Sequence, residues 1–183
     1  MLSEKQYFKQ WLVGFTDGDG TFTVHKADPK YPLNRKFTFK LSISMPNSQV
    51  LHYIQKQLRV GTISKPHDNI ISFYVSNRED LINIILPKIN EIYIFDEFSL
   101  LTVKQHRYDR FRRCLLIYDN PSLSSAEKDR RITAIWGEKL PDNYKSHVWM
   151  YYLNQEDFKA KVLKGETRYH SDPHLIISKP WLK

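Results

Sequence analysis

Residues 11–22 read "WLVGFTDGDGTF", and this stretch decides the fold. It joins an apolar run to two aspartates and three glycines, and a strand-like pattern follows at once. Upstream, Ser3 and Gln6 have the spacing of a capping box, in which the serine hydroxyl accepts a backbone N–H and the glutamine side chain reaches back. A helix is therefore predicted from near Glu4 to about Asp17.

Strand and helix patterns continue along the chain. Apolar and polar side chains alternate over Thr21–Lys26 and again over 36–44, as in strands with one buried face. Helical spacing follows over 47–58 with Asn47 as its cap, then a hairpin pattern over 61–76, then helical spacing over 78–89 and 100–118. The order helix, two strands, helix, two strands, helices predicts an α+β fold with an antiparallel sheet.

The C-terminal third has a different pattern. Ser124 and Glu127 repeat the capping-box spacing, so a helix is expected to reach about Trp136. Beyond it the sequence is polar and irregular. We interpret 1–118 as one domain and 119–183 as a helical extension and linker.

Composition narrows the class of function. The chain has 28 Lys and Arg against 20 Asp and Glu, a formal charge of +8, and such a surface attracts polyanions such as nucleic acid. Cys114 lies in an apolar run, which favours a buried, inert thiol over a nucleophile or metal ligand. No apolar run approaches the roughly 20 residues of a membrane span, so a soluble protein with no membrane partner is expected. Only 6 glycines beside many Ile, Lys, Asn and Tyr indicate an AT-rich coding genome, which favours an organelle, a mitochondrion before a chloroplast.

The two aspartates do not fit the common Asp-Gly loops. Counted from Asp17, the sixth position of a calcium loop would be Phe22 instead of glycine. A phosphate-binding loop would need Gly-Lys-Ser/Thr, whereas Gly20 precedes Thr21 and Phe22. Two interpretations stay open: turn residues between a helix and a strand, with glycines that supply positive φ, or a site for a cation.

Two features favour the cation site. Acidic residues at a helix C-terminus face the negative end of the helix dipole, which is unfavourable unless a cation compensates. Gly14 and Gly18 lie one turn apart, so one face of the helix lacks side chains and a second helix could cross it closely.

Residues 12–20, Leu-Val-Gly-Phe-Thr-Asp-Gly-Asp-Gly, resemble the signature helix of the LAGLIDADG homing endonucleases and intron maturases, position by position. The resemblance covers roughly Lys5 to Tyr118. It implies an αββαββα core with a saddle-shaped antiparallel sheet, and a metal-dependent endodeoxyribonuclease that hydrolyses both strands of a long DNA target.

The resemblance also implies roles for individual residues. Asp19 would be the metal-binding acid, the Gly18 carbonyl a further oxygen ligand and Lys104 the active-site lysine, whereas Asp17 would be structural. Hard oxygen ligands suit Mg²⁺. The family often has a polar residue where this chain has Met45.

The polar face of the predicted sheet is expected to contact DNA, since a twisted antiparallel sheet can lie along the major groove. Its members, by period two, are Thr23, His25, Lys36, Thr38, Lys40, Ser42, Ser44, Ser64, Ser72 and Tyr74. Lys26, Arg35 and Lys65 are better placed for phosphate groups.

One motif supplies one acid, whereas a duplex has two strands, so a partner subunit with a second LAGLIDADG motif is expected. The partner is a second copy in a homodimer, or a complementary half. The sequence "KQWLV" at 9–13 recurs loosely as "KPWLK" at 179–183, as if a second motif helix were approached. Two alternatives to the nuclease are an RNA maturase for a group I intron and a non-catalytic RNA-binding scaffold.

Overall fold

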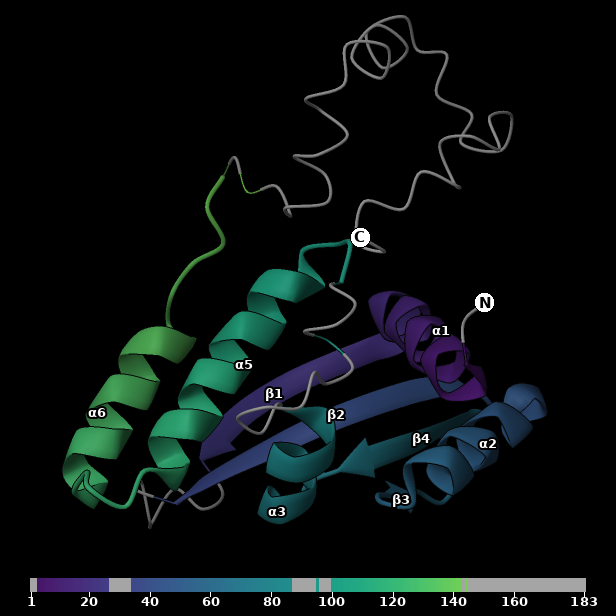
Figure 1. Cartoon of the computed structure of the whole chain (residues 1–183), viewed down its shortest axis with the longest axis horizontal. Coiled ribbons are helices and arrows are strands. Elements are labelled where there is room, and N and C mark those ends of the chain that lie inside the picture. Colours follow the sequence, from purple (N-terminus) through teal and green to yellow (C-terminus); the bar gives the residue numbers. More distant parts are fainter. Residues whose placement is uncertain (1–2, 27–33, 87–94, 96–99, 143, 145–183) are drawn as a thin grey trace, which may run out of the picture. The chain divides into compact units, whose positions relative to one another are not determined.

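The structure is a computed structural model that describes residues 3–26, 34–86, 95, 100–142 and 144. In chain order its elements are α1 (Glu4–Asp19), β1 (Gly20–Lys26), β2 (Arg35–Ser44), the 3₁₀ turn η1 (Met45–Asn47), α2 (Gln49–Leu58), β3 (Thr62–Ile63), β4 (Ile70–Val75), α3 (Arg78–Asp80), the π-helical turn η2 (Leu81–Ile85), α5 (Lys104–Asp119) and α6 (Ser125–Trp136) (Figure 1). The predicted α+β class and element order are confirmed. No helix in the described ranges is both long and apolar enough to cross a membrane.

The four strands form one antiparallel sheet in the order β1-β2-β4-β3. Because side chains alternate between faces, each strand sends its apolar set to the same side. The burial of β2 alternates along its length, with Phe37, Phe39 and Leu41 buried and Lys36 and Lys40 exposed. Helices α1, α2, α3 and α5 lie on the apolar side (Figure 1).

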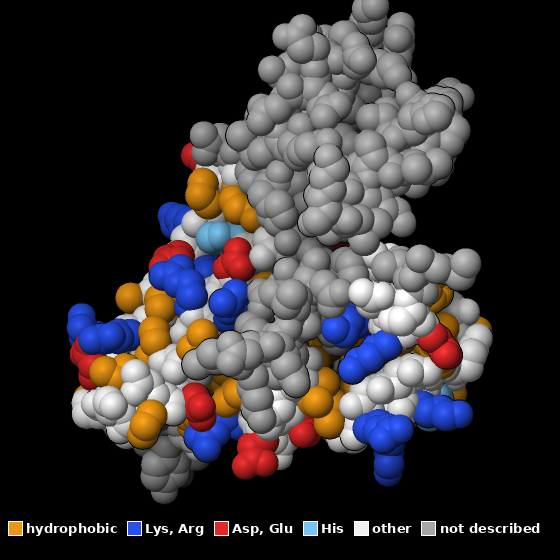
Figure 2. All heavy atoms as spheres, viewed as in Figure 1, with side chains coloured by type: hydrophobic (Ala, Val, Ile, Leu, Met, Phe, Trp, Pro, Cys, Tyr) orange, Lys and Arg blue, Asp and Glu red, His pale blue; other side chains and the backbone are white. Residues whose placement is uncertain are grey.

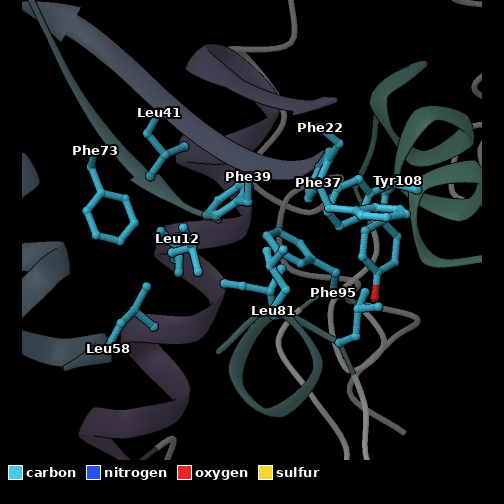
Figure 3. Close-up of a cluster of buried hydrophobic side chains, with 14 of the residues drawn as sticks. Leu12, Phe22, Phe37, Phe39, Leu41, Leu58, Phe73, Leu81, Phe95 and Tyr108 are labelled. Carbon is cyan, nitrogen blue, oxygen red and sulfur yellow. The ribbon is translucent and has the colours of Figure 1, made fainter. Parts of the chain in front are cut away.

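The core lies between that apolar face and the helices. Phe22, Phe39, Tyr108 and Phe95 are almost fully buried and their rings contact one another, with centroids 5.1–5.8 Å apart (Figure 3). Leu12 from the motif helix is also fully buried in this core. Burial of large aromatic side chains drives this packing and fixes α1 and α5 against the same two strands.

Local signals at the helix starts were mostly correct. Ser3 and Gln6 form the complete capping box, and α1 then continues two residues beyond the predicted end. Ser124 accepts the Glu127 N–H, but the Glu127 carboxylate binds Arg130 and Arg131 instead of closing the box.

Other boundaries differ from the prediction. Asn47 does not cap α2, because it lies in η1 and donates its side-chain amide to Ser44. The helix predicted over 78–89 is a single α-turn followed by η2, and its last residues lie outside the described ranges. Leu101, which lies within the helix predicted over 100–118, precedes α5 and is 50% exposed.

Helix α6 packs on α5 and on the end of the sheet. Arg35 at the start of β2 donates to Asp129 and Thr133 of α6, and its side chain is only 7% exposed. The expected role of Arg35 at phosphate groups is therefore wrong, since its guanidinium is paired and covered. Helix α6 belongs to the same compact unit as the other described elements, Met1–Tyr144, whereas the boundary predicted at 118 would separate it from them.

Candidate active site and nucleic-acid interface

The motif helix ends at the point where the candidate catalytic residues meet. Asp19 is the last residue of α1 and is exposed, and Gly20 begins β1 directly. The Gly20 N–H donates to the Thr16 carbonyl and so closes the helix. The chain therefore turns from helix to strand with no intervening loop, which holds the Asp19 backbone at the edge of the sheet.

Lys104, the first residue of α5, reaches this helix end from 86 residues along the chain. Its ammonium donates to the Gly18 carbonyl at 2.6 Å and to the Thr16 carbonyl at 3.1 Å. These carbonyls belong to the last turn of α1, where the helix dipole is negative. Within this chain the cation that lies at the helix end is the Lys104 ammonium, and the metal ion expected there from the sequence stays a prediction.

The surroundings of Lys104 change its acidity. Burial lowers the pKa of the Lys104 ammonium, Asp17 and Asp19 oppose that shift by attraction, and Arg107 adds to it by repulsion. The net direction is downward. A lysine with a lowered pKa gives up a proton more readily than an exposed one.

Asp17 has a different environment from Asp19. One of its carboxylate oxygens accepts the Leu101 N–H at 2.5 Å, and the other accepts the Thr102 N–H at 3.2 Å and the Thr102 hydroxyl at 2.7 Å. The carboxylate thus ties α1 to the turn that precedes α5, in agreement with the structural role expected for Asp17.

The three motif glycines serve two different purposes. A Cβ at Gly14 or Gly18 would have no atom within 4 Å, so both face open space on an exposed side of α1. A Cβ at Gly20 would lie 2.4 Å from the Thr16 methyl group, so Gly20 is required for close contact and not for positive φ. The interpretation of this glycine as a positive-φ turn residue is wrong.

The oxygen ligands at the end of α1 are of the kind that magnesium binds, but they are too few for a complete magnesium site. Asp19 offers a carboxylate and Gly18 a carbonyl, both hard oxygen ligands. Among the described residues no group of three or more His, Cys, Asp or Glu side chains could hold a metal ion. The Gly18 carbonyl is already bonded to Lys104. Asp19 and the Gly18 carbonyl by themselves therefore supply part of such a site.

The second candidate region is the polar face of the sheet. The register places Thr23 opposite Thr38, His25 opposite Lys36, Lys40 opposite Tyr74 and Ser42 opposite Ser72, so the predicted members do share one face. A hollow of about 530 Å³ on this face is lined by Lys36, Thr38, Lys40, Ser64, Lys65, His67, Asp68, Ile70, Ser72 and Tyr74. Figure 2 shows the molecule in the orientation of Figure 1, where basic side chains are interspersed with acidic ones.

Several hydroxyl groups of this face make hydrogen bonds within the sheet. The Ser42 and Ser72 hydroxyls lie 2.9 Å apart, and the Ser64 hydroxyl accepts the Ser72 N–H at 3.1 Å. Ser72 is only 6% exposed. These serines hold strands together, and the exposed charged or titratable members of the predicted set are His25, Lys26, Lys36, Lys40 and Lys65.

Some residues of both regions lie outside the predicted set. Thr21, which begins the predicted first strand, lies opposite Lys40, and Thr62 lies opposite Tyr74, so both extend the polar face; for Thr62 the alternation with Ser64 was a usable signal. Thr102, which links Asp17 to the start of α5, had no signal in the sequence, because its partner is 85 residues away. Met45 begins η1 at the end of β2 and is 39% exposed.

Comparison with known sequences supports the resemblance seen in the motif. The family model described as "LAGLIDADG endonuclease" matches residues 12–115. A probable intron-encoded endonuclease of Schizosaccharomyces pombe, Cox1-I1b, is 38% identical over 134 residues, which are 72% of this chain and 33% of that protein. A probable intron-encoded endonuclease 4 of Neurospora crassa is 32% identical over 87 residues, 46% of this chain and 14% of that protein. The chain thus spans a third or less of the length of these two relatives.

Solved structures share the fold. The homing endonuclease I-TnaI superposes with a TM-score of 0.61 at 22% identity, over 85% of this chain and 96% of that one. The meganuclease I-SmaMI, bound to uncleaveable DNA, superposes with a TM-score of 0.61 at 20% identity, over 80% of this chain and 49% of that one. Since the family model spans more than half of the sequence and the fold agrees, this chain belongs to the LAGLIDADG endonuclease family.

Proposed function

We propose that this chain provides one half of the active site of an intron-encoded homing endonuclease, which hydrolyses both strands of a long DNA target once a second LAGLIDADG half is paired with it. The observation that carries the proposal is the meeting of Lys104 with the last turn of the motif helix, beside the exposed Asp19. Membership of the family supports nuclease chemistry at this place.

In the proposed mechanism Asp19 and the Gly18 carbonyl would hold Mg²⁺ together with an acid from the second half. Bound Mg²⁺ makes a water more acidic and neutralises charge on the phosphodiester oxygens. Lys104, beside these two ligands, would donate to the attacking water or to a phosphate oxygen, where it would stabilise negative charge as it develops.

The open sheet face is the proposed DNA-binding surface. Two antiparallel strands fit the width of the major groove, and exposed side chains of alternate residues reach base edges and phosphates. Lys36, Lys40 and Lys65 would supply the charge that displaces counterions from the DNA backbone. The net charge of +8 supports this assignment.

Pairing is proposed to use the exposed glycine face of α1, where Gly14 and Gly18 allow a second helix to approach closely. A second copy and a complementary half remain the two proposed partners. Solved relatives of both sizes support this pair of arrangements, since the chain covers 96% of the I-TnaI chain but 49% of the I-SmaMI chain.

We place the protein in a mitochondrion. Two fungal relatives are named as intron-encoded endonucleases, and an "Uncharacterized mitochondrial protein RF1" of Saccharomyces cerevisiae is 27% identical over 113 residues, 62% of this chain and 22% of that protein. The composition typical of an AT-rich genome agrees with this location.

The test is cleavage of a duplex that spans the intron insertion point, with Mg²⁺ and with the second half present, by wild type, Asp19→Asn and the control Asp142→Asn. Asp142 is exposed and is not part of the site. Wild type and the control are expected to cut both strands, and Asp19→Asn to bind without cutting. Tight binding of the intron RNA without any DNA cleavage would contradict the nuclease and favour the maturase.

A further inference from the structure

Asp17 and Thr102 form a link between the motif helix and α5, and this link has a consequence for the lysine. The Asp17 carboxylate accepts three hydrogen bonds from Leu101 and Thr102, two from backbone N–H groups and one from the threonine hydroxyl. These residues are 84 and 85 positions away in the chain. The carboxylate therefore docks the turn before α5 onto the last turns of α1.

The same threonine starts α5. Val103, the N-cap residue, makes no side-chain capping bond. Instead the Thr102 hydroxyl accepts the Lys104 N–H at 3.2 Å while it donates to Asp17. A continuous chain of hydrogen bonds thus runs from the Asp17 carboxylate through the Thr102 hydroxyl to the backbone of Lys104.

The result is a closed loop of contacts. Lys104 is held by its backbone through Thr102, and its ammonium returns to the Thr16 and Gly18 carbonyls on either side of Asp17. A lysine side chain has four rotatable bonds, so its ammonium takes a defined position only if its backbone is fixed relative to the target. The backbone of Lys104, through Thr102 and Asp17, and its ammonium are therefore both held against the last turns of α1.

We infer that Asp17 and Thr102 are positioning residues for Lys104: they set the distance between its ammonium and the end of the motif helix that carries Asp19. This inference rests on the proposed nuclease function for its kinetic consequence, but the placement of the ammonium is independent of that function. Asp17 and Thr102 act through the lysine and do not themselves contact the reacting groups.

The test compares Thr102→Val, which removes the linking hydroxyl at nearly constant volume, with Thr102→Ser, which retains it. Ser124→Ala is the matched control, because it also removes a hydroxyl at a helix start, that of α6, away from the site. Each variant of the 183-residue chain is measured for its single-turnover cleavage rate, its affinity for the same DNA and its thermal unfolding.

The second readout is the ε-methylene resonance of Lys104 in protein with isotope-labelled lysine, assigned by its absence from Lys104→Met. In Thr102→Val and in Asp17→Asn this resonance is expected to move toward that of solvent-exposed lysines. It is expected to stay in place in Thr102→Ser and Ser124→Ala. This measurement requires neither metal nor DNA, so it separates failure of the inference from failure of the nuclease proposal.

Kinetically, Thr102→Val is expected to cut about tenfold more slowly with little change in DNA affinity, because small misplacement of a catalytic group costs rate and not binding. In a Lys104→Met background the same change is expected to have no further effect, as for two residues that act through one group. An unmoved Lys104 resonance in Thr102→Val, or an undiminished effect in the Lys104→Met background, would overturn the inference.

Discussion

The junction of α1 with α5 and the open face of the sheet are both polar, but they use their polar groups in opposite ways. At the junction Asp17, Thr102 and Lys104 bind partners more than 80 residues away and so define positions for chemistry. On the sheet Ser42, Ser64 and Ser72 bind their neighbours across strands and leave the lysines exposed. The junction is specified by individual contacts, whereas the sheet offers a charged surface.

The comparison predicts that substitution of Lys104 at the junction has the largest effect. Lys104→Met retains much of the volume but loses the ammonium, so cleavage is expected to slow by about two to three orders of magnitude, as for a lost charge-stabilising donor. The affinity for DNA should change little, because Lys104 lies outside the sheet face that is proposed to bind DNA. Single-turnover rates and DNA titrations measure both, with Lys128→Met on α6 as the control. If the cleavage rate and the DNA affinity fell by comparable factors, Lys104 would act in DNA binding, as proposed for the lysines of the sheet.

Substitution of a glycine is expected to have the next largest effect. A Cβ at Gly14 meets nothing in this chain, and alanine favours a helix, so Gly14→Ala should leave the unfolding free energy equal or slightly higher. Pairing with the second half should weaken by about 1–3 kcal/mol, the usual cost of inserting atoms into a close contact. Analytical ultracentrifugation measures the association. Unchanged association would move the pairing surface away from the glycines.

On the sheet face a single change should have a smaller effect. Lys40→Ala is expected to weaken DNA binding severalfold and to lower the slope of log affinity against log salt by about 1, because one phosphate contact is lost. Ser42→Ala is the matched control, because the Ser42 hydroxyl lies 2.9 Å from the Ser72 hydroxyl and so has a partner within the sheet. Salt titrations of binding measure both. An equal loss of DNA affinity in the two variants would mean that the Ser42 hydroxyl contributes as much to DNA binding as the Lys40 charge.

The smallest expected effect is on the pH dependence of stability. Burial lowers the pKa of Lys104 in the folded chain. Between that lowered pKa and the ordinary lysine pKa of the unfolded chain, the unfolded chain binds more protons, so the unfolding free energy of wild type should rise with pH relative to Lys104→Met. Urea unfolding at a series of alkaline pH values measures this difference. A Lys104 resonance that titrates together with the exposed lysines would refute it.

Element types followed from local periodicity. Alternation over β2 and helical spacing over α5 depend only on neighbours in sequence, because a strand and a helix repeat every 2 and about 3.6 residues. The same alternation identified which side of the sheet is polar. Where the local signal was ambiguous, as at Asn47 and over 78–89, the packing of the chain decided the outcome.

The resemblance of residues 12–20 supplied Asp19 and Lys104 as candidates, but it contained no distances. That the Lys104 ammonium meets the Gly18 carbonyl at 2.6 Å is a property of the packed core, in which Phe22 and Tyr108 hold β1 and α5 together. A local sequence pattern does not predict contacts between residues that are so far apart in the chain.

The sequence by itself determined the element order, the polar and apolar faces, the capping of α1 and the motif that marks the family. Only the tertiary structure decided that Arg35 pairs with Asp129, that Ser72 lies below the polar face, and that Asp17 and Thr102 fix the start of α5. The physical reason is that periodicity and capping arise within one or two turns of chain. Ion pairs and hydrogen bonds between distant segments exist only after burial of the aromatic core has brought those segments together.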